Sequence, residues 1–119
     1  MPRPRSGRRI GHCPDCTFFK PAGIPAARLQ VSVIHFDELE AMRLVDGEGL
    51  KQSEAAERMG ISQPTVARLL ASGRKKTALA LAHGQALQLE AGVAPLSFPS
   101  EGGGRRRRRG RHGRGAPEI

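Results

Sequence analysis

Three consecutive segments in the middle of the chain carry apolar residues at helical spacing, with polar residues on their remaining sides. The segments span residues 36–46, 52–59 and 62–83, and breaks that contain glycine separate them. Gly84 ends the last segment. The pattern therefore predicts a mainly α fold with a core of three helices. The apolar positions are Leu39, Met42 and Val45 in the first segment, Ala55, Ala56 and Met59 in the second, and Val66, Leu69 and Leu70 in the third.

Strand-like patterns flank the predicted helices. Val and Ile dominate residues 31–34, and residues 86–90 alternate between apolar and polar side chains, so we expect these stretches to pair as a short two-stranded sheet. Residues 1–30 are rich in Pro, Arg and Gly, which predicts an extended N-terminal arm with little regular structure. Residues 92–119 are dominated by Pro, Ser, Gly and Arg and predict a disordered C-terminal tail. The helical domain would then span residues 31–91.

The sequence between the second and third helices favours a sharp turn. Gly60 can adopt the left-handed backbone conformation that ends a helix, since it has no Cβ to clash. Ser62 can cap the next helix with its hydroxyl, and Pro64 is tolerated in the first helical turn. Ala56 is small enough to let two helices cross closely. This layout is typical of a helix-turn-helix motif over residues 52–71, and an ordinary helical hairpin in a small bundle is the alternative.

A helix-turn-helix protein places the beginning of its second motif helix in the major groove of DNA. We therefore expect sequence-specific binding to double-stranded DNA. Gln63 and Arg68 are the best candidates for base reading, because Gln pairs with adenine and Arg with guanine through two hydrogen bonds. For each residue the alternative is a solvated helix face. The predicted base-reading residues are Ser62, Gln63, Thr65 and Arg68, and the predicted phosphate contacts are Arg74, Lys75 and Lys76.

The net charge of +9 over 119 residues is distributed unevenly. Residues 1–9 contain four Arg and residues 102–119 contain seven, whereas residues 10–101 hold nine basic against ten acidic groups. The terminal segments therefore carry the basicity, and the C-terminal one is expected to attract any polyanion in a salt-dependent way. The arm residues that we expect to reach into the minor groove are Arg3, Arg5, Arg8 and Arg9.

Other partners stay open on the sequence alone. Attraction by the arginine-rich tail applies equally to RNA, although no RNA-reading module with stacking aromatics is visible. A helical domain of this kind could also act as an adaptor that contacts RNA polymerase or a regulator. We also consider a homodimer, because one small motif buries little DNA surface and palindromic sites match two-fold proteins.

His12, Cys13 and Cys16 lie in the sequence HCPDC, where the two thiols have the spacing of a zinc knuckle. A structural zinc site needs more ligands than these, so closing one would require the chain to fold back or a symmetric dimer to form. Incidental reduced cysteines and a redox-sensitive CxxC pair are the alternatives. Two Cys exclude a disulfide framework, and we expect no other cofactor.

The acidic run DELE at residues 37–40 could in principle supply a catalytic carboxylate pair. No nucleophile with a base, no glycine-rich phosphate loop and no full metal set accompanies it, so we expect an ordinary helical turn and no enzyme. No segment approaches the roughly eighteen apolar residues of a membrane span, and the N-terminus lacks the apolar segment of a secretory signal. We therefore expect a cytoplasmic protein that associates with the nucleoid when bound to DNA and has no membrane partner.

Several of these segments together resemble the UPF0251 (DUF134) family of small prokaryotic proteins, over about residues 1–91. The matching segments are MPRPR at the start, FKPAGIP, DELEAMRLVDGEGL, the motif itself, GRKKTALAL and HGQALQLE. The resemblance implies a DNA-binding transcriptional regulator whose helix-turn-helix is similar to that of sigma-70 region 4. Lys51 and His35 stand where related sequences tend to place a capping Ser or Thr, so we expect both helices to begin with weaker caps than in the family.

Overall fold

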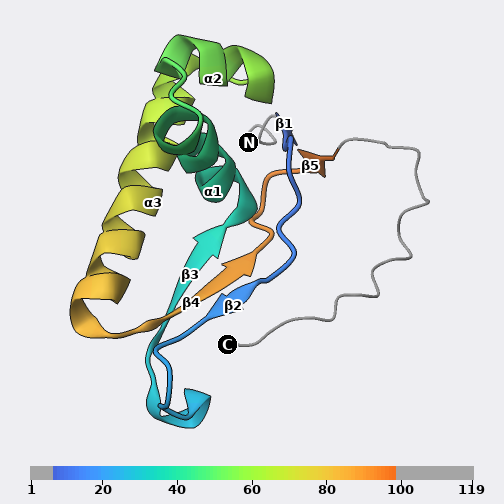
Figure 1. The fold of residues 1–119 in the computed structure, drawn as a ribbon. Coiled ribbons are helices and arrows are strands. Elements are labelled where there is room, and N and C mark those ends of the chain that lie inside the picture. Colours follow the sequence, from blue (N-terminus) through green and yellow to red (C-terminus); the bar gives the residue numbers. More distant parts are fainter. Residues whose placement is uncertain (1–6, 99–119) are drawn as a thin grey trace, which may run out of the picture.

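The computed structural model describes residues 7–98, which form three α-helices, two short helical turns of other types and two small β-sheets. Along the chain, the elements are β1 (Arg8–Arg9), β2 (Phe18–Phe19), the 3-10 helix η1 (Ala26–Arg28), β3 (Val31–His35), α1 (Phe36–Met42), the π-helix η2 (Arg43–Gly47), α2 (Gln52–Met59), α3 (Gln63–His83), β4 (Ala86–Glu90) and β5 (Leu96–Ser97). In Figure 1, α3 runs alongside the larger sheet, and α1 and α2 pack against α3. The three predicted helices are confirmed.

Glycines end both α2 and α3. Gly60 follows α2 with a φ of +71°, and Gly84 follows α3 with a φ of +66°, a left-handed conformation that glycine adopts without a Cβ clash. Ser62 caps α3 as predicted, because its Oγ accepts a hydrogen bond from the Thr65 backbone N–H at 3.2 Å. The turn at Gly60 thus separates a helix of 8 residues from one of 21 residues.

At the beginning of both α1 and α2, a glutamate side chain binds the backbone N–H of the cap residue. The Glu38 carboxylate accepts a hydrogen bond from the His35 backbone N–H at 3.0 Å, and the Glu54 carboxylate accepts one from the Lys51 backbone N–H at 2.9 Å. In both helices the glutamate lies three residues after the cap, so its side chain can turn back to the free N–H. Each glutamate thus supplies the half of a capping box that binds the cap residue's own N–H.

The first predicted helix differs in detail from the expectation for residues 36–46. It ends as an α-helix at Met42 and continues as the π-helix η2. Ala41 and Leu44 are 0% and 1% exposed, whereas Leu39 and Met42, which we expected on the apolar face, are only partly buried. The small side chain of Ala41 is therefore fully buried in the core, where it lets the neighbouring helices approach closely.

The helical core lies where α1, η2, α2 and α3 meet. The predicted apolar faces of α2 and α3 are confirmed as part of it. Their apolar residues form stripes rather than continuous apolar stretches, and no helix within residues 7–98 is long and apolar enough to cross a bilayer. The buried residues of the core are Ala41, Leu44, Ala55, Ala56, Met59, Val66, Leu69 and Leu70.

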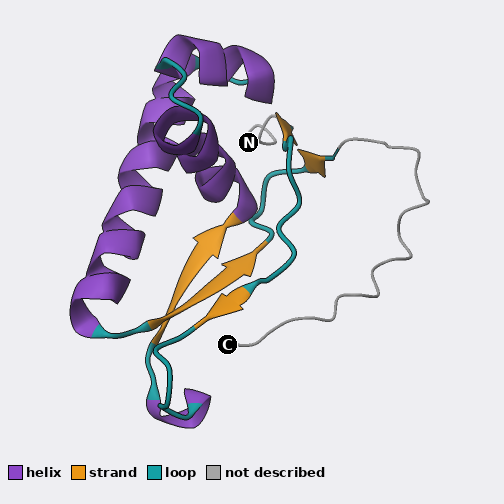
Figure 2. Cartoon of the chain, in the orientation of Figure 1, coloured by secondary structure: helices purple, strands orange, loops and turns teal. Residues whose placement is uncertain are grey.

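The larger sheet contains the predicted strand pair and one more strand. β3 and β4 pair in parallel, with Val31 opposite Ala86 and His35 opposite Glu90, which confirms the expected pairing. The three helices form the crossover that two parallel neighbouring strands require. The unexpected third strand is β2, which pairs antiparallel with the other edge of β4, so the strand order is β2-β4-β3 (Figure 2).

Both ends of the described chain pack onto the domain. β1 pairs in parallel with β5, and Ile10 and Ala94 next to these strands are only 2% and 6% exposed. Within residues 7–30, where we expected little regular structure, the chain forms β1, β2 and η1, and β5 lies beyond residue 92 in the segment expected to be disordered. Strands of two residues carry no detectable pattern, because distant partners rather than local sequence hold them. Residues 1–6 and 99–119, on which the rest of the arm and tail predictions fall, lie outside the described residues.

Candidate nucleic-acid interface

The beginning of α3 presents an exposed stripe on the side away from the core. Pro64, Arg68, Ala71 and Lys75 are all exposed, and their spacing of three or four residues places them on one helical face. The small side chain between the two cations leaves the helix backbone accessible from this side. The opposite face is closed against the core by Val66, Leu69, Leu70 and Gly73.

A short chain of hydrogen bonds links three of the four predicted base-reading residues. The hydroxyls of Ser62 and Thr65 lie 2.8 Å apart, and Arg68 Nη2 donates to Thr65 Oγ1 at 3.3 Å. Ser62 is engaged as the helix cap, and Thr65 is half-buried. Gln63 is exposed, and its side chain has no hydrogen bond or ion pair with the described residues. Gln63 and Arg68 therefore keep the most free donors and acceptors.

The three predicted phosphate contacts have different surroundings. Arg74 forms an ion pair with Asp46, with Nη2 2.7 Å from Oδ1, and this hydrogen bonding lowers the pKa of Asp46 below its ordinary value. Lys76 is paired with Glu38 at 2.9 Å. Lys75 is exposed and has no ion-pair partner among residues 7–98. Of the three cations, Lys75 alone needs no internal contact to be broken before it can bind a phosphate.

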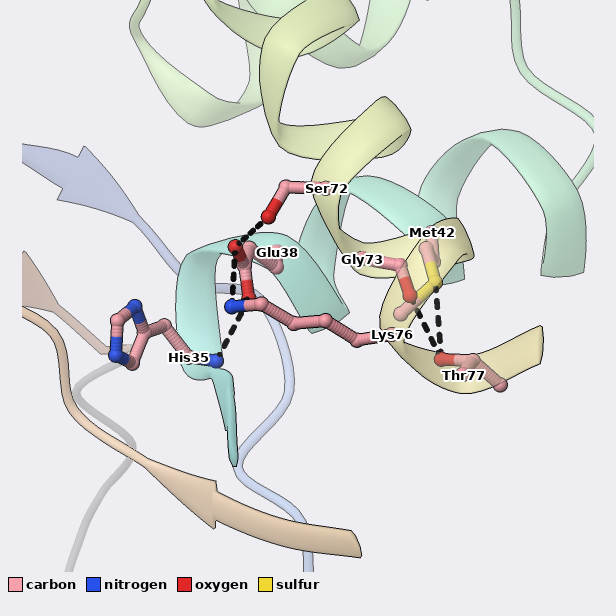
Figure 3. Close-up of polar contacts among 7 residues, drawn as sticks. All are labelled: His35, Glu38, Met42, Ser72, Gly73, Lys76 and Thr77. Atoms are coloured by element: carbon pink, nitrogen blue, oxygen red, sulfur yellow. Dashed lines mark hydrogen bonds and ion pairs between the residues drawn. The ribbon is translucent and has the colours of Figure 1, made fainter. Parts of the chain in front are cut away.

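Glu38 of α1 is the centre of a polar network that ties α1 to α3 (Figure 3). Its side chain is 7% exposed and accepts hydrogen bonds from the Ser72 hydroxyl at 2.6 Å and from Lys76 Nζ at 2.9 and 3.0 Å. Burial by itself raises the pKa of Glu38, but hydrogen bonds from Ser72, from the His35 backbone and from Lys76 outweigh it. The resulting pKa lies below the ordinary value.

Gly73 brings α1 and α3 into close contact beside this network. A Cβ at this position would lie 3.0 Å from Cε of Met42 and 3.3 Å from Cβ of Glu38. Thr77, one turn later on α3, donates its hydroxyl to the Gly73 carbonyl at 2.8 Å and lies 3.8 Å from Sδ of Met42 (Figure 3). These contacts set the distance between α1 and α3, and with it the position of the exposed stripe of α3.

The two arm residues that the structure describes, Arg8 and Arg9, bind other parts of the same chain. Arg8 is 4% exposed and forms an ion pair with Asp37 at 3.0 Å. Arg9 donates from Nη2 to the Glu57 carbonyl at 2.9 Å and from Nε to the Arg58 carbonyl at 3.1 Å, so it caps the C-terminus of α2. Minor-groove contacts, as predicted for both residues, would compete with these bonds. The other predicted arm residues, Arg3 and Arg5, lie outside the described residues.

We did not expect the acids of α1 to be buried and to connect segments that lie far apart in the chain. Besides Asp37 and Glu38, Glu40 is 3% exposed; it accepts two hydrogen bonds from Arg43 at 2.9 Å and one from the Gly11 backbone N–H at 2.8 Å. One signal was present: Asp37 shares a helical stripe with the buried residues at positions 41 and 44. Every carboxylate in this run is occupied by a partner, which agrees with a structural role.

The predicted half zinc site is not completed by other residues of the described chain. Cys13 and Cys16 are free and exposed, and no group of three or more His, Cys, Asp or Glu within residues 7–98 is arranged to hold a metal ion. His12 is exposed as well. The two thiols and His12 would therefore depend on ligands from elsewhere, such as those of a second copy in a symmetric dimer.

Comparisons with known proteins identify similar chains of unknown function. The model of a family described as "Protein of unknown function DUF134" matches residues 1–95. A UPF0251 protein of Moorella thermoacetica is 48% identical over 99 residues, which are 83% of this chain and 66% of that protein. A UPF0251 protein of Dehalococcoides mccartyi is 49% identical over 96 residues, or 81% and 82% of the two chains. One from Shewanella sediminis is 51% identical over 89 residues, or 75% and 93%.

The lengths of these relatives differ. The chain spans 66% of the Moorella thermoacetica protein and 60% of a relative from Desulforudis audaxviator, to which it is 50% identical over 92 residues. No solved structure matches the chain.

Proposed function

The chain belongs to the DUF134 family of proteins of unknown function, whose curated members are named UPF0251 proteins, and we propose that it is a sequence-specific DNA-binding protein that regulates transcription. One observation carries the proposal: the capped beginning of α3 is exposed immediately after the tight turn at Gly60, and no acid lies within residues 62–77. This helix terminus is the part that helix-turn-helix proteins insert into the major groove. The protein would act in the cytoplasm as a binding protein rather than as an enzyme.

The exposed stripe of α3 supports insertion into a groove. The major groove is about 12 Å wide and admits one α-helix, so bulky side chains all around the helix would hold it away from the bases. The side chains next to Arg68 on this face are small, Ala67 and Ala71, and both are exposed. A close approach of the helix backbone to the base edges therefore requires no rearrangement of the core on the opposite face.

Base reading falls to Gln63 and Arg68 in this proposal. Gln63 lies in the first turn of α3 with a free amide, which suits a bidentate contact with adenine. Arg68 follows one turn later, and its bond to Thr65 Oγ1 at 3.3 Å leaves the remaining guanidinium donors for guanine. Each such contact discriminates against the wrong base by about 1–3 kcal/mol. Ser62 and Thr65 support them by ordering the first turn.

Phosphate binding would come from Lys75 and from the terminal arginines. Lys75 shares the stripe with Arg68 and has no internal partner among residues 7–98. Arg74 and Lys76 are engaged by Asp46 and Glu38, so we assign them a smaller share than the sequence suggested. The seven Arg of residues 102–119 add affinity without sequence preference.

Selection of bound sequences from a random double-stranded DNA library would test the proposal. The selected site is then compared with a scrambled site by gel shift, using the full chain, Arg68→Ala and the control Arg28→Ala. Arg28 is exposed and belongs to η1, which lies at the opposite end of the domain from α2 (Figure 1). Both variants lose one positive charge, so they differ only in position.

Arg68→Ala should lower the preference for the selected site by about tenfold, which corresponds to the loss of one base contact. Arg28→Ala should leave this preference unchanged. Failure to enrich any sequence would contradict sequence-specific binding, and equal retention of RNA would favour the RNA-binding alternative. Symmetry in the selected site would indicate that two copies bind together, as for other two-fold proteins.

A further inference from the structure

A hollow of about 250 Å³ lies between β1, the end of α1, η2 and the last turn of α2. It is separate from the exposed stripe of α3. Residues from both ends of the described chain contribute to its wall, so no local sequence pattern marks it. Its charged walls are Arg9, Arg43, Arg58 and Glu40, and its apolar walls include Ile10 and Leu44.

The charges around this hollow do not balance. Among residues 7–98, Glu40 is the single carboxylate in the wall, and it is paired with Arg43, which also reaches Glu48 at 3.1 Å. The Arg9 guanidinium donates hydrogen bonds to backbone carbonyls. The Arg58 guanidinium has no hydrogen bond or ion pair with the part of the chain that the structure describes. Two positive charges therefore line the hollow without a carboxylate partner.

One of these two cations is held in place. Arg9 is anchored by its two hydrogen bonds to the end of α2, at 2.9 and 3.1 Å, and its Nη1 makes no hydrogen bond with residues 7–98. An anchored guanidinium loses little conformational entropy when it binds an anion. Arg58, from the last turn of α2, can then approach from the other wall and complete the pair.

We infer that this hollow is a binding site for a small oxyanion that carries phosphate or carboxylate groups. Planar guanidinium groups recognise both through paired N–H···O bonds. The volume admits a small molecule, and the apolar walls of Ile10 and Leu44 reduce the competition from water. Arg9 lies beside Gly60 of the α2–α3 turn, and Arg58 is in the last turn of α2. An anion bound to both would therefore also stabilise that turn.

A free anion fits this place better than a DNA phosphate. The hollow has room for a small molecule between its walls, whereas the phosphodiester groups of a duplex are contacted along an extended surface. The site and its test involve the free protein only, so they do not depend on the proposed DNA binding.

The experiment is a titration of the full-length chain, labelled with 15N, with inorganic pyrophosphate and separately with succinate at constant ionic strength. Amide resonances of Ile10, Gly11 and Leu44 and the Nε–H resonances of Arg9 and Arg58 report on the hollow. We expect these resonances to shift in a saturable way with at least one of the two probes. Pyrophosphate binding alone would identify a phosphate-type ligand, and succinate binding alone a carboxylate-type ligand.

Arg58→Gln and the control Arg28→Gln complete the test. Both variants remove one exposed Arg and keep the arginine-rich residues 102–119, so general attraction by that segment is the same in both. Arg58→Gln should weaken binding at the hollow at least tenfold, while Arg28→Gln should change it less than twofold. Shifts confined to residues outside the hollow, or equal affinity of both variants, would overturn the inference and assign binding to the terminal arginines.

Discussion

The guanidinium of Arg9 covers the glycine of the α2–α3 turn: a Cβ on Gly60 would lie 3.1 Å from Cζ of Arg9. Arg9 holds this position because it donates hydrogen bonds to the last carbonyls of α2. The N-terminal segment therefore supports the very turn that positions α3. Arg9, which we predicted to belong to a DNA-binding arm, therefore has a structural role at this turn.

Replacing Gly60 tests this contact. The left-handed backbone costs a non-glycine residue about 1–2 kcal/mol, and in Gly60→Ala the close approach to Arg9 adds to that cost. Gly84→Ala is the matched control, because Gly84 has a similar φ of +66° and nothing within 4 Å of its added Cβ. In urea denaturation, Gly60→Ala should lower the free energy of unfolding more than Gly84→Ala does.

The excess loss should disappear when Arg9 is also replaced by Ala, since the smaller side chain no longer meets the new Cβ. Gly84→Ala should cost the same in both backgrounds. An unchanged cost of Gly60→Ala in the Arg9→Ala background would show that the two residues are not coupled.

Glu38 should make the stability of the domain depend on pH. Its pKa is lower in the folded chain than in the unfolded chain, so the ionised form stabilises the fold. This contribution is fully present above the unfolded pKa of about 4.3 and is lost as the pH falls through the lower folded pKa. The free energy of unfolding, measured by urea denaturation from pH 7 to pH 3, should therefore fall below about pH 4.3 partly because of Glu38.

Glu38→Gln should lower stability at pH 7 by about 1–3 kcal/mol, as expected for lost hydrogen bonds to a charged group, and should reduce the loss in acid. Glu54→Gln, which removes the corresponding glutamate cap of α2, is the control for the capping contribution. An acid loss in Glu38→Gln as large as in the parent chain would exclude Glu38 as its source.

Much of the helical architecture follows from local sequence, and most of the site does not. Gly60, Gly84 and the capping Ser62 mark the helix ends because each acts on its own neighbours. The β3–β4 pairing was also visible, since five-residue strands carry a pattern. In contrast, the pairing of β1 with β5 and the partners of Arg8 depend on distant parts of the chain. The same holds for Arg74 and Lys76, whose carboxylate partners precede them by 28 and 38 residues.

Lys75 and Lys76 are adjacent but should respond oppositely to substitution. Lys75→Ala should reduce the slope of log affinity for DNA against log salt concentration by about 0.9, the value of one phosphate contact, with little change in stability. Lys76→Ala leaves Glu38 buried with fewer partners and should lower the free energy of unfolding by about 1–2 kcal/mol. Gel shifts across salt concentrations and urea denaturation separate the two effects. If Lys76→Ala reduces the salt slope and Lys75→Ala does not, then Lys76 is the phosphate contact.

The ion pair between Arg8 and Asp37 should be required for folding stability. Both side chains are buried, 4% and 10% exposed, and their atoms lie 3.0 Å apart. Removing one partner leaves an uncompensated buried charge, which costs about 3–5 kcal/mol in such pairs. Arg8→Ala should therefore lower the free energy of unfolding by roughly 3 kcal/mol. Asp37→Asn should also destabilise the domain, because it removes the carboxylate charge that lies 3.0 Å from Arg8.

The double variant Arg8→Met/Asp37→Leu distinguishes this role from a DNA contact, because it removes both charges and restores part of the stability. Arg5→Ala, at another predicted arm position, is the comparison for DNA affinity. If Arg8→Ala keeps the stability of the parent chain but loses DNA affinity as Arg5→Ala does, then Arg8 serves the minor groove and the ion pair with Asp37 is dispensable. Because a fully desolvated guanidinium cannot bind a phosphate without first leaving its carboxylate, we expect the loss of stability instead.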